Sequence, residues 1–331
     1  MAIVVDAHSD ILNDIYPRRL LGERKILENF WIPKMIKGGI DIRILALYSE
    51  SQFLPELALR RALDLISMLY EEIQSSSKSI LCTNFKCLKE ATEEKKIGFI
   101  LGMEGSEPLG SDIQLLRIFY KLGLRVLGLT HTLRTYLADG APLKKKNKGR
   151  EGGLTEAGIE FLEEAQKMGI LIDVSHLNDS SFWDVIKFKK SPIIASHSNC
   201  RSLCHTPRNI SDKQIKAIAD SGGVIGINSC SLLVQGGTLE DLLNHIDHLA
   251  NKGGIEHTGL GLDFADYLYK YMTEPEKKTI SYEWIKPVDG LSGDEDVPKI
   301  TEKLSKRGYK PREIDLIMGE NFIRLFKEIL K

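Results

Sequence analysis

The sequence predicts an α/β fold, namely a closed (β/α)8 barrel of the TIM type. Three observations support this prediction. Short apolar, β-branched runs alternate with longer segments of helical periodicity, the runs number eight, and polar side chains directly follow several of them. Eight buried strands alternating with helices are typical of a closed parallel barrel, and an open doubly wound sheet is the alternative.

The eight strands are predicted from runs rich in Val, Ile and Leu that are too short to be helices. They cover residues 3–6, 41–47, 98–103, 125–129, 171–174, 192–195, 224–228 and 258–262.

The helices between these strands are predicted from apolar residues that recur with helical spacing. They cover residues 55–74, 112–122, 155–168, 179–187, 212–220 and 239–251. Ser211 is placed to cap one helix, and Gly123 and Gly169 are placed to end two others. The segment after the first strand gives the least clear helical pattern.

The pattern loosens between residues 264 and 298, a stretch that contains TEPEKKT and GLSGDEDVP, and two helical segments at 299–307 and 312–331 end the chain. We interpret 264–298 as an insertion after the eighth strand, because loops at that end of a barrel form walls or lids over the active face. We therefore expect residues 1–331 to form a single domain.

Composition narrows the function class. Lys and Arg total 45 against 46 acidic residues, so the formal charge of -1 gives no reason to expect nucleic acid or a membrane surface as a partner. The basic run 144–150 is interpreted as a solvated loop. Five cysteines, without zinc-ribbon spacing, and an N-terminus without a signal-like segment lead us to expect a cytoplasmic protein.

Residues that can bind a metal ion or transfer a proton lie just after the apolar runs, where barrel enzymes carry their active sites. They are His8, Asp10, Glu104, His131, His176, His197 and Asp263. Residues i and i+2 of a strand face the same side, so His8 and Asp10 can bind one ion together. Imidazole with carboxylate suits zinc, cobalt or manganese, and Glu104 is the obvious carboxylate to bridge two ions.

A loop after the sixth run, NCRSLCHTPRN at 199–209, carries two arginines at the same end of the predicted barrel. Either Arg201 or Arg208 can hold a substrate carboxylate through a bidentate pair, or simply anchor the loop. Cys200 and Cys204 in this loop do not form a redox motif, and we interpret them as idle thiols.

Nearly the whole chain resembles the membrane (renal) dipeptidase family, and in particular its soluble microbial members. The matching segments are DAHSD, LGMEG, GLRVLGLTH, GLTEAGIEFLEEAQKMGILIDVSH, SPIIASHSNCRSLCHTPRNISD, GGVIGIN, GLGLDF and IMGENFIRLF. Matches in this order at so many strand ends are far more specific than any single motif.

The resemblance implies a zinc metallopeptidase that hydrolyses dipeptides with a hydroxide held between two zinc ions. The implied ligands, shared between two ions with Glu104 bridging, are His8, Asp10, Glu104, His176 and His197. The resemblance further implies that His131 polarises the scissile carbonyl, Arg208 binds the C-terminal carboxylate and Asp263 handles the proton of the nucleophile. Other divalent transition metals are alternatives, and the acceptance of a D-residue at the C-terminal position is left open.

The chain departs from the family pattern in three places. Ser9 stands where the family often has Asn, and we expect it to point away from the barrel axis. Cys230 stands near a position where the family often has a substrate-contacting Tyr, and Ala265-Asp266 replaces the usual Asp-Gly. The metal chemistry is therefore expected to be retained and the substrate preference altered.

The alternatives are another two-metal barrel hydrolase, such as a deaminase, lactonase or N-acyl amino acid hydrolase, and a catalytically silent metal- or amino-acid-binding protein. Many barrel hydrolases of the first group begin with His-x-His and bridge their metals with a modified lysine, unlike this chain. The glycines of GGIEHTGLGLDF do not form a dinucleotide-binding motif. A homodimer is expected only by analogy.

Overall fold

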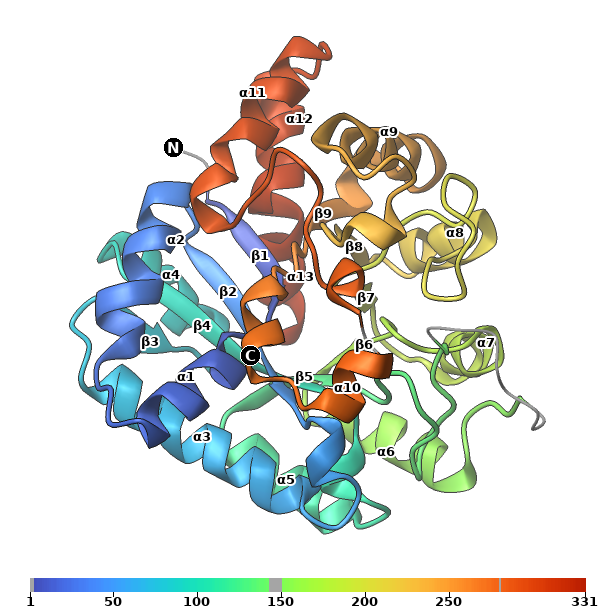
Figure 1. Cartoon of the computed structure of the whole chain (residues 1–331). Coiled ribbons are helices and arrows are strands. Elements are labelled where there is room, and N and C mark those ends of the chain that lie inside the picture. The colour runs from blue at the N-terminus through green and yellow to red at the C-terminus, as the bar shows by residue number, and fades with distance from the viewer. Residues whose placement is uncertain (1–2, 143–150, 280) are drawn as a thin grey trace.

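Eight parallel strands form a barrel at the centre of the computed structural model, and helices surround it (Figure 1). The structure describes residues 3–142, 151–279 and 281–331, so the basic run 144–150 lies outside the described residues. The barrel strands are β1 (Val5–Ser9), β2 (Ile42–Tyr48), β4 (Ile97–Glu104), β5 (Leu124–Gly128), β6 (Leu171–Asp173), β7 (Ile193–Ala195), β8 (Val224–Ile227) and β9 (Thr258–Leu260).

The ring closes because β2 pairs with β1 on one edge and with β4 on the other. The predicted closed barrel is confirmed, and the open sheet is excluded. A ninth strand, β3 (Ser79–Leu81), pairs with the first residues of β4, while β5 pairs with β4 from Leu101 onward. Strand β3 therefore lies outside the ring. Its three residues were too short a run to be recognised in the sequence.

The helices that the sequence predicted are present with small shifts at their ends. They are α3 (Ala58–Gln74), α5 (Ile113–Lys121), α6 (Glu156–Lys167), α7 (Asp179–Phe188), α8 (Asp212–Asp220), α9 (Leu239–Gly253) and α11 (Pro298–Lys306). Several begin at a side chain that accepts a hydrogen bond from the first turn, and Ser211 forms a full capping box with Gln214 at the start of α8.

Other helices were not assigned from the sequence. They are α1 (Ile11–Leu20), α2 (Ile32–Gly38), α4 (Phe85–Glu93) and α10 (Glu274–Thr279). Helix α1 contains Pro17, which obscures its helical pattern.

The predicted terminal helix 312–331 is interrupted. It consists of α12 (Pro311–Asp315), a π-helical turn (Leu316–Glu320) and α13 (Asn321–Ile329). Gly319 in the π-turn lies against β1, and a Cβ atom there would come within 2.1 Å of the Ile3 carbonyl oxygen. The turn thus brings the chain close to the barrel wall.

The segment 264–298 carries 3-10 turns at Asp266–Tyr271, Tyr282–Trp284 and Asp294–Asp296, together with α10. Figure 1 shows this orange segment crossing in front of the barrel strands. The assignment of the whole chain to one domain stays a prediction.

Buried apolar side chains form two clusters, one on each face of the barrel strands. One contains Ile42, Ile44 and Ile100 together with Phe322 and Phe326 of α13. Tyr48 and Glu104 follow in the same alternation, so their side chains belong to the inner face of the barrel. The larger cluster lies between the outer face and the surrounding helices.

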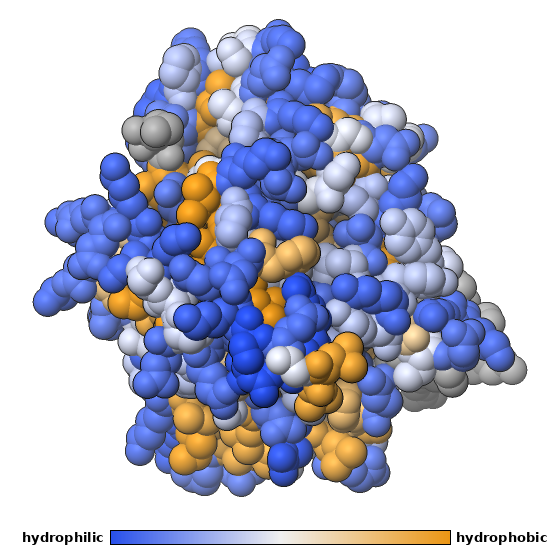
Figure 2. Space-filling view, turned by 60° about the vertical axis from the view of Figure 1, so that its left-hand side comes forward, coloured by the Kyte–Doolittle hydropathy of each residue, from blue (hydrophilic) through white to orange (hydrophobic). Residues whose placement is uncertain are grey.

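The surface is mainly hydrophilic on the face shown in Figure 2, with apolar side chains in separate patches. Among the described residues, no helix combines the length and the apolar character needed to cross a bilayer.

Cys82 and Cys87 form a disulfide that the sequence did not predict. Cys200 and Cys204 are free, as expected.

Candidate metal centre

The structure brings the predicted residues together at the C-terminal end of the barrel. His8 is the next-to-last residue of strand β1, and Glu104 is the last residue of β4. The others lie in the loops that directly follow β1, β5, β6, β7 and β9. Three overlapping groups each have ligand atoms within 4.8 Å of one another: His8, Glu104 and His197; Glu104, His131 and His176; and His8, Asp10 and Asp263.

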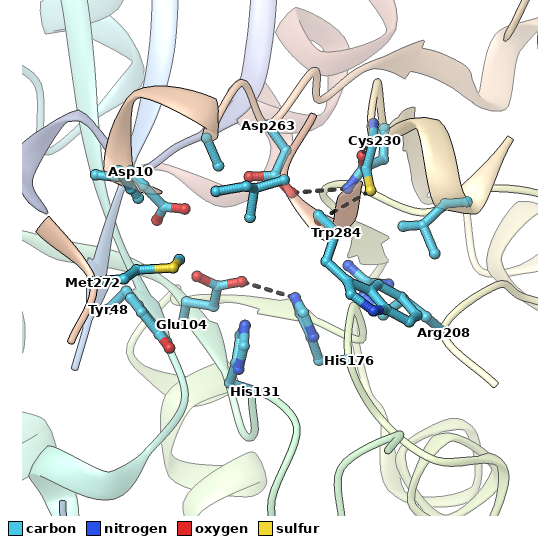
Figure 3. Close-up of a pocket in the computed structure, with 15 residues that line it drawn as sticks. Asp10, Tyr48, Glu104, His131, His176, Arg208, Cys230, Asp263, Met272 and Trp284 are labelled. Carbon is cyan, nitrogen blue, oxygen red and sulfur yellow. Dashed lines mark hydrogen bonds and ion pairs between the residues drawn. The ribbon is translucent and has the colours of Figure 1, made fainter. Parts of the chain in front are cut away.

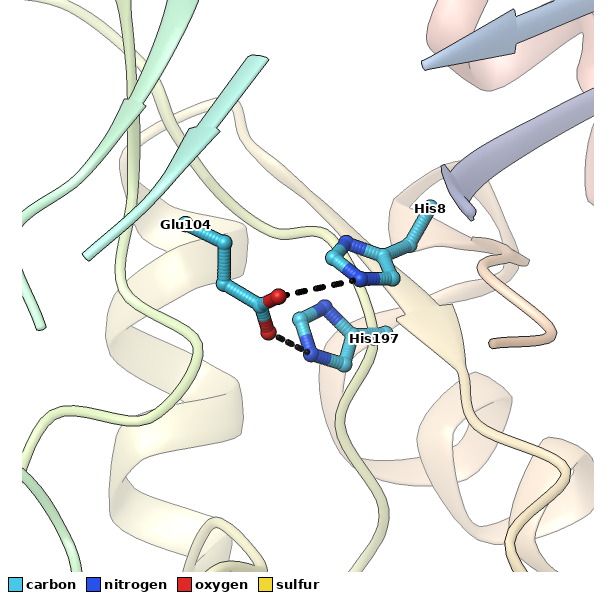
Figure 4. Close-up of side chains that lie close together, drawn as sticks. All are labelled: His8, Glu104 and His197. Carbon is cyan, nitrogen blue, oxygen red and sulfur yellow. Dashed lines mark ion pairs between the residues drawn. The ribbon is translucent and has the colours of Figure 1, made fainter. Parts of the chain in front are cut away.

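Glu104 is the centre of this arrangement. Its Oε1 lies 2.8 Å from His176 Nε2 and 3.3 Å from His197 Nε2, and its Oε2 lies 3.6 Å from His8 Nε2. Figure 4 shows the imidazoles of His8 and His197 directed at the two oxygens of this carboxylate. The side chain is 9% exposed, so both oxygens are largely removed from water.

A bulge in β1 directs His8 into the barrel. Asp6 pairs with Arg43 of β2, yet Ser9 pairs with Leu45, so β1 uses three steps where β2 uses two. Without the extra residue, His8 would point to the same side as Arg43, away from the axis. With it, Ser9 takes the outward side, as expected, and His8 turns inward.

Two of the site residues adopt a left-handed backbone, which non-glycine residues rarely do. The φ angles are 68° for His176 and 52° for Asp263. Such conformations cost about 1–3 kcal/mol each and persist where surrounding contacts hold them. The His176 carbonyl accepts a hydrogen bond from Ala141 N at 2.6 Å, and Asp263 Oδ2 accepts one from Asn228 Nδ2 at 2.9 Å.

A buried chain of hydrogen bonds from Asp173 through Ser196 fixes the tautomer of His197. Ser196 Oγ donates to Asp173 Oδ2 at 2.5 Å, and it lies 2.6 Å from His197 Nδ1. Because the single hydroxyl proton is used on Asp173, Nδ1 must carry the proton that joins it to Ser196. His197 Nε2 is then unprotonated, and its lone pair faces Glu104 and His176. A neutral imidazole with a free lone pair is the form that binds a cation.

Burial and neighbouring charges shift the pKa values of the site residues, and for His8 these two effects oppose each other. Burial opposes the charge on His8, but the carboxylates of Glu104, Asp10 and Asp263 outweigh it and raise the His8 pKa to about 10. Burial lowers the pKa of His131 to about 4. Burial also raises the pKa of Glu104 well above its usual value and that of Asp263 to about 6.

Burial likewise lowers the pKa of His176 and of His197 well below the usual histidine value. Two neutral imidazoles thus face a carboxylate that burial disfavours in its charged form. Their nitrogens lie 2.9 Å apart, Nε2 to Nε2. In addition, His8 Nε2 and Asp10 Oδ1 are buried without a hydrogen-bond partner among the described residues. A cation among these atoms would satisfy all of them, so the donor set fits a metal centre.

The two loop arginines separate. Arg201 turns outward, forms a bidentate ion pair with Asp179 at 2.8 Å and donates to the Asn209 carbonyl. Arg208 turns inward and is 4% exposed. It donates to Ser198 Oγ at 3.0 Å and to the His197 carbonyl at 2.7 Å, which aims its guanidinium at the cavity. Burial lowers the pKa of Arg208.

The cavity above the carboxylates has a volume of about 100 Å³ (Figure 3). Besides the predicted residues it is lined by Tyr48, Asn228 and Cys230 from the strand ends, and by Met272 and Trp284 from the insertion. Sequence reasoning did not select Tyr48, although it ends an apolar strand as the predicted residues do. The insertion residues had no signal in the sequence beyond their place after the last strand.

Comparison with known proteins gives a consistent picture. The family model for membrane dipeptidase, peptidase family M19, matches residues 1–277. A protein from Klebsiella pneumoniae, described as an uncharacterized protein in the pqqA 5′ region, is 29% identical over 263 residues, which are 77% of this chain and 90% of that protein.

Two solved structures are similar over almost the whole chain. One is dipeptidase AC, a metallopeptidase of family M19, with 25% identity, a TM-score of 0.87 and 99% of each chain covered. The other is a metallopeptidase from Rhodobacter sphaeroides bound to a phosphinate mimic of the dipeptide L-Ala-D-Ala, with 24% identity, a TM-score of 0.87 and coverage of 99% of this chain and 100% of that chain.

Proposed function

Because the chain belongs to the membrane dipeptidase family and is on that ground a metal-dependent dipeptidase, we propose that it cleaves dipeptides at a two-zinc centre. The proposed ligands are His8, Asp10, Glu104, His176 and His197. The observation that carries the proposal is the convergence of three imidazoles on both oxygens of the Glu104 carboxylate, which supports its role as the bridge.

The proposed division places His8, Asp10 and Glu104 on one ion and Glu104, His176 and His197 on the other. Two such cations, when bound, would supply Lewis acidity toward the scissile carbonyl and make hydroxide available near neutral pH. The remaining steps fall to residues of this chain.

Arg208 supplies the binding group for the substrate's terminal carboxylate. It is buried, it presents a planar fork of N–H donors, and its neighbours Ser198 and His197 fix its direction. A dipeptide brings its C-terminal carboxylate within reach of one fixed arginine while its peptide bond lies over the carboxylates of the centre. The small volume of this cavity, about 100 Å³, favours short peptides over long ones.

His131 and Asp263 are proposed to assist the reaction. His131 is neutral near pH 7, because burial lowers its pKa to about 4, and a neutral imidazole donates an N–H to the carbonyl oxygen without giving up its proton. The Asp263 pKa of about 6 lies close to the working pH, so this carboxyl can take a proton from the attacking water and return it to the leaving amine.

The test is hydrolysis of a panel of L-L and L-D dipeptides by the purified protein before chelation, after chelation and after zinc is restored, with elemental analysis of the metal. We expect chelator-sensitive turnover and two zinc ions per chain. The L-D pairs are included because the Rhodobacter sphaeroides neighbour was solved with a mimic of L-Ala-D-Ala. Bound metal without turnover of any dipeptide would reject the proposal in favour of lactones or N-acyl amino acids.

A pair of variants separates an enzyme from a silent binding protein. Asp263→Asn should retain the metal and lose turnover, whereas Asp266→Asn, three residues further on and outside the lining of the cavity, should keep both. A silent binding protein would have no turnover to lose in either variant. A cytoplasmic location and a homodimer stay predictions.

A further inference from the structure

A second cavity of about 260 Å³ lies beside the metal centre, and we call it the α1 cavity. Helix α1 provides one side of it with Tyr16, Pro17 and Leu20. The turn after β2 provides Phe53, and Arg61 of α3 lies behind that turn. It is more than twice as large as the cavity over the carboxylates, and nothing in the proposed reaction uses it.

The two cavities share a wall. Tyr48, Leu268 and Met272 line both of them. Figure 3 shows Tyr48 and Met272 on the opposite side of Glu104 from Arg208. A dipeptide whose carboxylate is held by Arg208 therefore has its N-terminal residue directed toward this shared wall.

The chemistry of the α1 cavity suits a large, mainly apolar group. The Arg61 guanidinium is 2% exposed, lies 4.0 Å from the centre of the Tyr16 ring and 4.8 Å from that of Phe53, and forms an ion pair with Glu50. Its charge is thereby compensated, and its aromatic neighbours present apolar faces. Its Nη1 is buried and has no hydrogen-bond partner among the described residues.

We propose that the α1 cavity holds the side chain of the substrate's N-terminal residue and selects large aromatic or aliphatic side chains there. This inference rests on the proposed function. The cavity over the carboxylates is the smaller of the two, about 100 Å³ against about 260 Å³. It accommodates the peptide backbone and small side chains, so a larger side chain has to pass Met272 into the α1 cavity.

The test compares kcat/KM for Gly-Ala, Leu-Ala and Phe-Ala, with Ala-Phe as the reversed control. Burying a leucine or phenylalanine side chain typically favours the complex by a factor of about ten or more. We expect Leu-Ala and Phe-Ala to exceed Gly-Ala by about tenfold and Ala-Phe to show no such gain.

Two cavity variants and one control variant locate the effect. Leu20 is 72% exposed and lines the α1 cavity, whereas the neighbouring Leu21 is 80% exposed and does not, so Leu20→Trp and Leu21→Trp form a matched pair that should fold equally well. Leu20→Trp narrows the cavity, and Phe53→Ala removes an aromatic wall. We expect each of these two to reduce the Phe-Ala advantage several-fold while Gly-Ala turnover is kept, and Leu21→Trp to change neither.

Equal kcat/KM for Gly-Ala and Phe-Ala in the wild type would overturn the inference, as would a Phe-Ala advantage that survives both Leu20→Trp and Phe53→Ala. Failure of the proposed function gives a different result, because then Gly-Ala and every other dipeptide of the panel would remain intact.

Discussion

Replacing Ser196 with alanine would remove the hydroxyl that links Asp173 to His197. Both contacts are short, 2.5 Å to Asp173 Oδ2 and 2.6 Å to His197 Nδ1, and Ser196 is 1% exposed, so water cannot take the place of the hydroxyl. Loss of such a partner behind a ligating histidine typically costs 10–100-fold in metal affinity, or about 1.4–2.7 kcal/mol. We expect that loss for the ion proposed to bind His197.

The assay is competition for zinc against a chromophoric chelator, which resolves two binding steps if the centre holds two ions. Only the step that involves His197 should weaken. Ser181→Ala is the matched control, because Ser181 is equally buried and its hydroxyl bonds to the backbone of Asp139 instead. It should cost about 1 kcal/mol of folding free energy and leave both zinc steps unchanged. Two zinc steps of wild-type affinity in Ser196→Ala would refute the tautomer argument.

Three further predictions concern charged groups. Arg208→Lys keeps the charge but loses the planar fork, so kcat/KM for dipeptides should fall by about 10–100-fold, measured by steady-state kinetics. Asp294→Ala leaves Arg43 buried with one carboxylate fewer, which should cost about 3–5 kcal/mol in urea unfolding. The hydrogen bond from His248 lowers the pKa of Asp212 to about 2, below its ordinary value of 3.8, so the stability that it adds is full above about pH 4 and lost as pH falls toward 2. The difference in melting temperature between wild type and Asp212→Asn should shrink over that window.

The barrel and the residues of its candidate metal centre could be predicted from the sequence for one physical reason. Parallel strands buried on both faces appear as continuous apolar runs, and their C-terminal ends meet at one side of the ring. Glu104 and His197 are far apart in the chain, yet each follows such a run, which was enough to predict that they meet. The choice between Arg201 and Arg208 was not available from the residues alone, because both lie in the same loop and only the fold directs them to opposite sides.

Features that depend on an exact register were not accessible. The bulge in β1 shifts the pairing with β2 by one residue between Asp6 and Ser9. The residue types at these positions do not predict a bulge. The simple alternation expected for a strand places His8 and Asp10 on one side correctly, but it does not say which side. The left-handed backbone of His176 and Asp263 is likewise invisible in the sequence, since neither position is glycine.

The insertion after β9 is connected to the chemistry through buried charge. Asp294 forms hydrogen bonds with both Nη atoms of Arg43, and Arg43 Nη2 lies 2.9 Å from Asp6 Oδ2. Asp6 Oδ1 accepts the backbone N–H of Leu262 at 2.8 Å. Asp6 stands two residues before His8, and Leu262 directly precedes Asp263. The contacts that anchor the insertion therefore also fix the two strand ends that carry the proposed ligand and the proposed proton carrier, so a change in the insertion that reaches Asp294 should affect the centre as well as the walls of the pocket.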